Sequence, residues 1–158
     1  MVGPRETNEW TLWIVAVSCP LHATEEYLTG WQEWARQALG IAMPTSLFLF
    51  MNAILAIAAL LAARVGWRQP AFSLVIPVAT LVNAIAFHII PTIIERRVSP
   101  GLYTAAILFL PFSSWALVGA ARDGVPRRPI MIAGVIGVLV AVGVVVGARL
   151  MSGASVGG

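Results

Sequence analysis

The sequence has no lysine, a single cysteine and few charged residues of either sign. Of its 158 residues, 59% are hydrophobic and 11% are charged, and the mean hydropathy is +0.87. A soluble domain carries about 25% charged residues to cover its surface, so an ordinary water-soluble domain is excluded. The ten cationic side chains are all arginines, which stand singly or in pairs. Without a basic run or stripe, no binding to nucleic acid is expected.

The scarcity of cysteine narrows the chemistry further. One thiol, Cys19, cannot form an internal disulfide or a cysteine-rich metal site. Cys19 lies in an apolar stretch, where we expect it to pack as a small hydrophobic side chain.

Long apolar stretches predict an all-α integral membrane bundle that forms one domain over residues 1–158. A bilayer core of about 30 Å needs about 20 mostly apolar residues per helix, so the length allows about five transmembrane helices. The expected spans are 10–28, 43–63, 71–94, 102–121 and 130–148. Polar and aromatic residues alternate over 31–40, which predicts a short helix lying in the membrane interface after the first span.

The last expected span contains the small-xxx-small pattern Gly143-Val-Val-Val-Gly147. Such a pattern permits close approach of two helix backbones. We favour close packing within the chain, and a homo-oligomer formed through this helix is the alternative. Membrane lipids are the other expected partners.

Polar residues that can carry chemistry gather toward one membrane face. The first span ends in His22-Ala-Thr-Glu25-Glu26, and helical geometry places both glutamates within about 60° of His22. Asn83 and His88 lie near the end of the third span, which runs in the same direction as the first. We therefore expect these side chains to meet in one layer, where an unpaired carboxylate is costly.

Two imidazoles and several carboxylates form a mixed nitrogen and oxygen ligand set, which suits Zn, Fe or Mn. A divalent cation would also neutralise the carboxylates. The candidate ligands are His22, Glu26, His88, Glu25 and Glu95, with Glu25 and Glu26 as candidate catalytic groups. The candidates for orienting ligands or binding substrate are Asn83, Tyr103, Thr104, Arg96 and Arg97, although the two arginines are better explained as headgroup anchors.

Three short motifs carry a resemblance to a known family. They read His22-Ala-Thr-Glu25-Glu26, Asn83-Ala-Ile-Ala-Phe-His88 and Val98-Ser-Pro-Gly-Leu-Tyr-Thr104. In order and spacing the chain resembles the HXXEE-motif family of small bacterial membrane proteins, which is largely uncharacterised. Two departures stand out: the interval from Asn83 to His88 is one residue longer than usual, and Val98 replaces a tyrosine.

The resemblance implies a bacterial inner-membrane protein. The arginines near helix ends favour a cytoplasmic amino terminus by the positive-inside rule. The amino-terminal side would hold Arg5, Arg64, Arg68, Arg122, Arg127 and Arg128, and the opposite side Arg36, Arg96, Arg97 and Arg149.

From the residues we favour a membrane-embedded enzyme with a metal site, working as a hydrolase on a lipid or another small amphipathic molecule. Three alternatives stay open. The cluster could handle protons or ions in a transporter, it could serve a non-catalytic accessory protein, or it could work without metal as an acid–base isomerase or cyclase.

Overall fold

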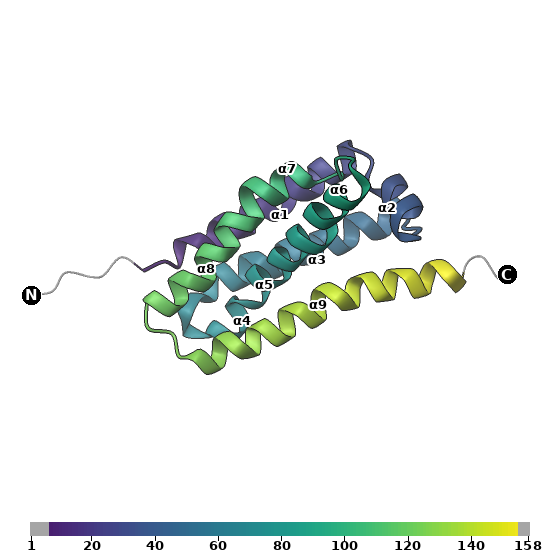
Figure 1. Ribbon diagram of the computed structural model, residues 1–158. Coiled ribbons are helices and arrows are strands. Elements are labelled where there is room, and N and C mark those ends of the chain that lie inside the picture. Colours follow the sequence, from purple (N-terminus) through teal and green to yellow (C-terminus); the bar gives the residue numbers. More distant parts are fainter. Residues whose placement is uncertain (1–6, 155–158) are drawn as a thin grey trace, which may run out of the picture.

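The chain folds into a bundle of helices. The computed structural model describes residues 7–154, with side chains described to residue 150, and the secondary structure of this part is entirely helical. Figure 1 shows the long helices side by side with their axes roughly aligned. In chain order the elements are α1 (Trp10–Leu28), α2 (Trp31–Leu39), α3 (Thr45–Val65), η1 (Gly66–Arg68), α4 (Pro70–Ser73), α5 (Val75–Val82), η2 (Asn83–Ile89), α6 (Ile90–Glu95), α7 (Leu102–Thr104), η3 (Ala105–Phe109), α8 (Leu110–Arg122) and α9 (Arg127–Ala154).

Four helical stretches of the described chain are long and apolar enough to cross a membrane. They cover Thr45–Arg68, Pro70–Glu95, Leu102–Arg122 and Arg127–Leu150, and each contains most of one expected span. The stretch expected to be the first span, α1, is not among them. Its last two turns carry His22, Glu25 and Glu26, which lower its mean hydropathy. A helix forms over residues 31–39, close to the expected 31–40.

The core forms where α1 packs on α3 and α8. Alanines at these contacts let the helix backbones approach closely. The buried core side chains are Leu12, Val15, Ala16, Cys19, Ala59, Ala62, Ala63, Ile76, Ala84, Ala105, Phe109 and Ala116. Cys19 is an apolar packing residue, as expected, and its thiol donates a hydrogen bond to the Val15 carbonyl at 3.3 Å.

The last helix, α9, forms one side of the bundle (Figure 1) and packs chiefly on α4 and α5. The close approach occurs at Gly137, where a Cβ would lie 2.6 Å from the Cβ of Val78. At Gly143 and Gly147 a Cβ would meet nothing in the described chain within 4 Å. The expectation of close intrachain packing through Gly143 and Gly147 was therefore wrong. The close contact between α9 and α5 lies about two turns earlier, at Gly137.

A hydrogen-bonded cluster ties together three segments at the end of the bundle away from α2. The Asp123 carboxylate accepts hydrogen bonds from the backbone N–H of Asn8 at 2.6 Å, the Asn8 amide at 2.7 Å and the Trp67 indole at 2.8 Å. The Glu9 carboxylate accepts the backbone N–H of Trp67 at 2.6 Å. The start of α1 and the α3–α4 and α8–α9 connections thus lie on one side, as the helix order predicted.

Asp123 gives the fold a dependence on pH. Desolvation raises the pKa of Asp123, but the hydrogen bonds from Trp67 and Asn8 outweigh it and hold this pKa below its ordinary value of 3.8. The stabilisation by this carboxylate is therefore complete above the ordinary pKa and is lost as the pH falls through the lower, folded-state pKa.

We expect Asp123→Asn to lower the free energy of unfolding at neutral pH by about 1–3 kcal/mol, because it removes a charged acceptor and leaves donors unpaired. The difference from the wild type should shrink in acid. Thermal unfolding in detergent, followed from neutral pH to about pH 3, measures both effects. Glu95→Gln, at an exposed carboxylate, is the control. Equal unfolding temperatures for Asp123→Asn and wild type at neutral pH would contradict this role.

Candidate metal centre

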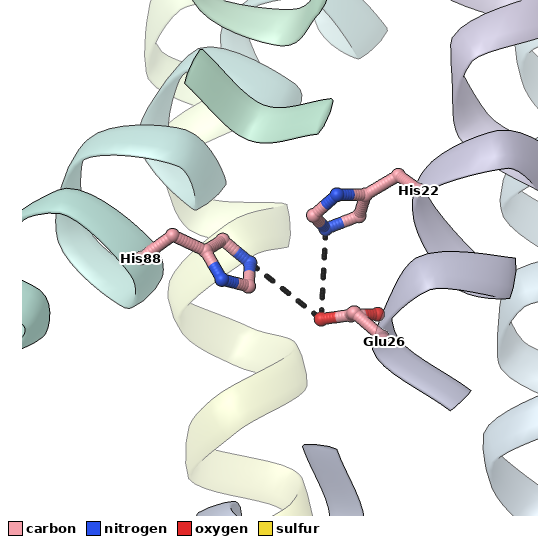
Figure 2. A group of neighbouring side chains, drawn as sticks. All are labelled: His22, Glu26 and His88. Carbon is pink, nitrogen blue, oxygen red and sulfur yellow. Dashed lines mark ion pairs between the residues drawn. The ribbon is translucent and has the colours of Figure 1, made fainter. Parts of the chain in front are cut away.

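Three buried side chains converge on one point at the other end of the bundle. The Nε2 atoms of His22 and His88 each lie 3.5 Å from Oε1 of Glu26, as Figure 2 shows. The imidazole rings are 4.8 Å apart and nearly perpendicular. His22, Glu26 and His88 are 3%, 5% and 0% exposed. Among the described residues they form a group whose ligand atoms lie within 4.8 Å of one another.

Two of the three side chains come from adjacent turns of α1. His22 and Glu26 are four residues apart, so they lie on the same helix face, one above the other. This face is turned inward, because the other buried residues of α1, such as Val15 and Cys19, belong to the bundle core. The first motif therefore places an imidazole and a carboxylate at the inner surface of the bundle.

The third side chain, His88, comes from the π-helical segment η2. In a regular α-helix Asn83 and His88, five residues apart, would point about 140° away from each other. The wider π-helical turn closes between residues five apart. His88 consequently reaches Glu26 while Asn83 lines the same cavity as His22 and Glu26. This accommodates the additional residue in the second motif.

A proline supports the departure from α-helical geometry in η2. Pro91 lacks an N–H and its ring clashes with the carbonyl four residues earlier, which belongs to Phe87. The freed Phe87 carbonyl accepts a hydrogen bond from the Ser99 hydroxyl at 3.4 Å. Pro91 thus frees an acceptor for the residue that contacts His88.

The hydrogen bonds around His22 determine which of its nitrogens carries the proton. The Glu25 carboxylate accepts the Thr104 hydroxyl at 2.5 Å and the Thr104 backbone N–H at 2.7 Å. Since a hydroxyl has one proton, Thr104 must accept from Nδ1–H of His22, 2.8 Å away. The Nε2 atom of neutral His22 therefore presents a lone pair toward Glu26.

His88 is oriented in the same way. Its Nδ1 lies 3.3 Å from the Ser99 hydroxyl, and Ser99 also lies 3.4 Å from the carbonyls of Phe87 and Pro100. When the serine hydroxyl donates to one of these carbonyls, it accepts from Nδ1–H of His88. The Nε2 lone pair of His88 then also faces Glu26.

The result is three electron-pair donors facing one another inside an apolar bundle. Neither Nε2 atom has a hydrogen-bond partner in the part of the chain that the structure describes. A single proton can bridge one of the two 3.5 Å gaps to Glu26, whereas a cation between the three atoms satisfies both. Two ligands at about 2.0–2.1 Å from a tetrahedral zinc ion lie roughly 3.3 Å apart. The two 3.5 Å distances from Glu26 to the imidazoles are close to this spacing.

The loop before α7 closes one side of the cluster. Gly101, with a φ of +89°, lies so close that a Cβ would be 2.8 Å from Cγ of Glu26 and from Cε1 of His88, and 2.9 Å from Cε1 of His22. On another side the Phe109 ring lies 4.5 Å from that of His22. Both the positive φ and the lack of room for a Cβ require glycine at position 101.

An apolar cavity of about 140 Å³ reaches the cluster from within the bundle. His22, Glu26 and Asn83 are among its few polar lining residues, and the segment 31–43 closes its end. Oδ1 of Asn83 is buried without a hydrogen-bond partner. A polar group placed in this cavity would therefore find an unused acceptor beside the three converging side chains.

The other candidate residues lie apart from the cluster. Glu25, expected as a ligand or general base, is instead bound by the backbone N–H groups of Tyr103 and Thr104 and acts on His22 only through Thr104. Glu95, Arg96 and Arg97 are exposed, because α6 ends at the surface.

The tyrosine positions also lie outside the cluster. Tyr103 is 60% exposed and Val98, which stands where the family has tyrosine, is 56% exposed. Neither position places a hydroxyl beside the histidines. The Thr104 hydroxyl, by contrast, lies 2.8 Å from Nδ1 of His22.

Sequence reasoning included Ser99 and Gly101 in the third motif but assigned them no contact with the cluster, and it missed Phe109. The Pro100-Gly101 pair was a usable signal, because such pairs mark tight turns that bring backbone close to other groups. Nothing in the sequence marks Phe109 among the many apolar residues of its helix.

Comparison with known proteins supports the motif assignment. A family model described as "Protein of unknown function with HXXEE motif" matches residues 13–116. This range contains the three converging side chains and the Gly101 loop, whereas α9 lies outside it. Comparisons with curated proteins and with solved structures gave no match.

We expect Gly101→Ala to lower the free energy of unfolding by about 2–5 kcal/mol, from roughly 1–2 kcal/mol of backbone strain and 1–3 kcal/mol of overpacking. Gly124→Ala is the matched control, since Gly124 has a φ of +84° but a Cβ there meets nothing within 4 Å. Thermal or denaturant unfolding in detergent compares the two variants. Equal losses would show that Gly101 does not pack against the cluster.

Proposed function

We propose that this chain, which belongs to the family of proteins of unknown function with an HXXEE motif, is a metal-dependent hydrolase embedded in the membrane. One observation carries the proposal: the lone pairs of two imidazoles and a carboxylate oxygen converge in a buried site where one proton cannot bridge both gaps. A divalent cation removes this conflict and neutralises a carboxylate that lipid cannot solvate.

The ligand set indicates the kind of chemistry. Two histidines and one glutamate bind zinc in catalytic sites that keep a fourth position for water or substrate. Iron and manganese accept the same nitrogen and oxygen donors. When bound, a metal with an open position lowers the pKa of water and supplies a nucleophile for hydrolysis.

The residues of the chain prepare the site for that chemistry. Thr104 and Ser99 hold the two imidazoles with Nε2 inward, and Glu25 fixes Thr104. Asn83 offers its unpaired Oδ1 to a hydrogen-bond donor of the substrate in the cavity, such as a hydroxyl. An ester or amide carbonyl suits this arrangement: water adds to its carbon, the bond to the leaving group breaks, and the leaving group takes the proton.

We further propose that α1 is inserted with the other long helices, which gives five spans. Its packing against α3 and α8 buries its apolar face, and the His22 and Glu26 side chains that lower its hydropathy point into the bundle. In this arrangement α2 lies in the interface and the site opens near that face. The amino-terminal side faces the cytoplasm of a bacterial inner membrane.

Metal content tests the proposal. We expect about one divalent ion per chain in protein purified without chelators, and at least about a tenfold loss in His22→Ala, His88→Ala and Glu26→Gln, because each removes a ligand. Glu95→Gln should retain the metal. Mass spectrometry of the purified proteins measures this, and thermal unfolding confirms that each variant is folded. If the folded wild-type protein takes up no Zn, Fe or Mn, the proposal of a metalloenzyme is wrong, and a cluster that shares protons is favoured.

The orienting role of Thr104 has its own test. We expect Thr104→Val to weaken metal binding by about 10–100-fold, because the hydroxyl that joins Glu25 to His22 is lost while the shape is kept. Thr104→Ser, which keeps the hydroxyl, should restore most of the affinity. Competition with a chelator of known affinity measures both. If the serine variant binds as weakly as the valine variant, the hydroxyl is not what orients His22.

A further inference from the structure

We infer that a groove between α3 and α9 binds the hydrocarbon chain of a neutral single-chain amphiphile and delivers its polar end to the His22, Glu26 and His88 cluster. This inference rests on the proposed function and names its substrate class. The groove has a volume of about 640 Å³, which lies within the usual range of about 300–1,000 Å³ for small-molecule sites.

The packing of the helices creates the groove. α3 packs chiefly on α1, whereas α9 packs chiefly on α4 and α5. The two helices therefore lie on either side of the stretch Pro70–Glu95 and do not pack closely against each other. Leu55 and Ala58 line the groove from α3, and Val140 and Val144 line it from α9. Since both walls belong to membrane-spanning stretches, the groove lies at the depth of lipid chains.

The groove is continuous with the cavity at the cluster. Both are lined by Glu26, Trp31, Met43, Asn52, Leu55, Asn83, Val140 and Val144. Ala71 and Phe72 line the end of the groove that lies away from the cluster. From Phe72 to Asn83 the distance is roughly 16 Å at 1.5 Å per residue, so an extended chain fits along the helices with its polar end at Asn83.

Asn83 is the feature that points to a ligand with a polar end. Its Oδ1 atom is buried without a partner in the described structure, and an unpaired buried polar atom is destabilising. Asn83 lines both the groove and the inner cavity. A ligand with a donor or a bridged water at this position satisfies the amide, while a pure hydrocarbon does not.

The lining also favours a neutral polar end over a phosphate. Among the described residues, no arginine lines the groove or the inner cavity, and the acidic residue that lines both is Glu26. Arg96 and Arg97 are exposed outside them. An anionic headgroup would meet a carboxylate without a cationic side chain beside it, whereas an ester or amide would not be repelled.

A photoactivatable monoacylglycerol tests the inference. The probe carries a diazirine in the middle of its acyl chain and is added to the protein in phosphatidylcholine nanodiscs. After irradiation, peptide mass spectrometry compares labelling of the groove residues Val75 and Ile76 with that of Ile57, which is 58% exposed on the outside of α3. We expect strong labelling of the α5 residues that excess unlabelled monoacylglycerol removes, while the labelling of Ile57 persists.

Two phenylalanine variants of α3 sharpen the test. Ala58→Phe fills the groove without touching the inner cavity and should lower labelling of Val75 and Ile76 by about tenfold. Ala53→Phe adds the same side chain at an exposed position outside the groove and should leave labelling unchanged. Equal labelling in both variants would overturn the inference.

Metal content, measured on the same samples, separates the two proposals. Metal without competable labelling of α5 overturns the groove and leaves the metal site standing. Competable labelling without metal leaves a lipid-binding groove and overturns the hydrolase. Ala58→Phe should keep its metal, because it lies outside the cluster.

Discussion

The structure depends on a carboxylate, Glu26, buried between two imidazoles inside an apolar bundle. Burial of a charge in such surroundings is tolerated when opposite charge or strong ligands compensate it. Here the neighbouring groups are the imidazoles of His22 and His88, whose Nδ1 atoms lie 2.8 Å from the Thr104 hydroxyl and 3.3 Å from the Ser99 hydroxyl, so that each ring can present an Nε2 lone pair to Glu26. The proposed metal site rests on this convergence, because a cation would compensate all three groups.

Much of the surrounding architecture serves to bring these donors together. The π-helical turn of η2 and Pro91 set the reach of His88 and free a carbonyl for Ser99. Gly101 lets the backbone of the α7 loop contact all three side chains. Each of these features costs local stability, through a widened helical turn, a missing hydrogen bond or a left-handed residue. Their coincidence at one point is the pattern expected where function, and not packing alone, determines the local structure.

The two ends of the bundle have different tasks. At one end Asn8, Trp67 and Asp123 join three segments through hydrogen bonds and set the position of α1. At the other end α1 carries His22 and Glu26 to the site. Between them, α9 packs on α4 and α5 instead of α3, and a groove remains between α3 and α9.

The sequence by itself determined the all-helical fold, four long apolar stretches and the layer in which His22, Glu26 and His88 meet, because hydropathy and helical periodicity are local properties of the chain. It could not decide what Glu25 and Glu95 contact, since whether a carboxylate faces a ligand site, a backbone N–H or solvent depends on neighbours far away in sequence. It missed the contact of Gly101 with all three side chains and the groove between α3 and α9. Those features were decided by tertiary structure alone, because they arise from how helices distant in the chain pack and where they fail to close.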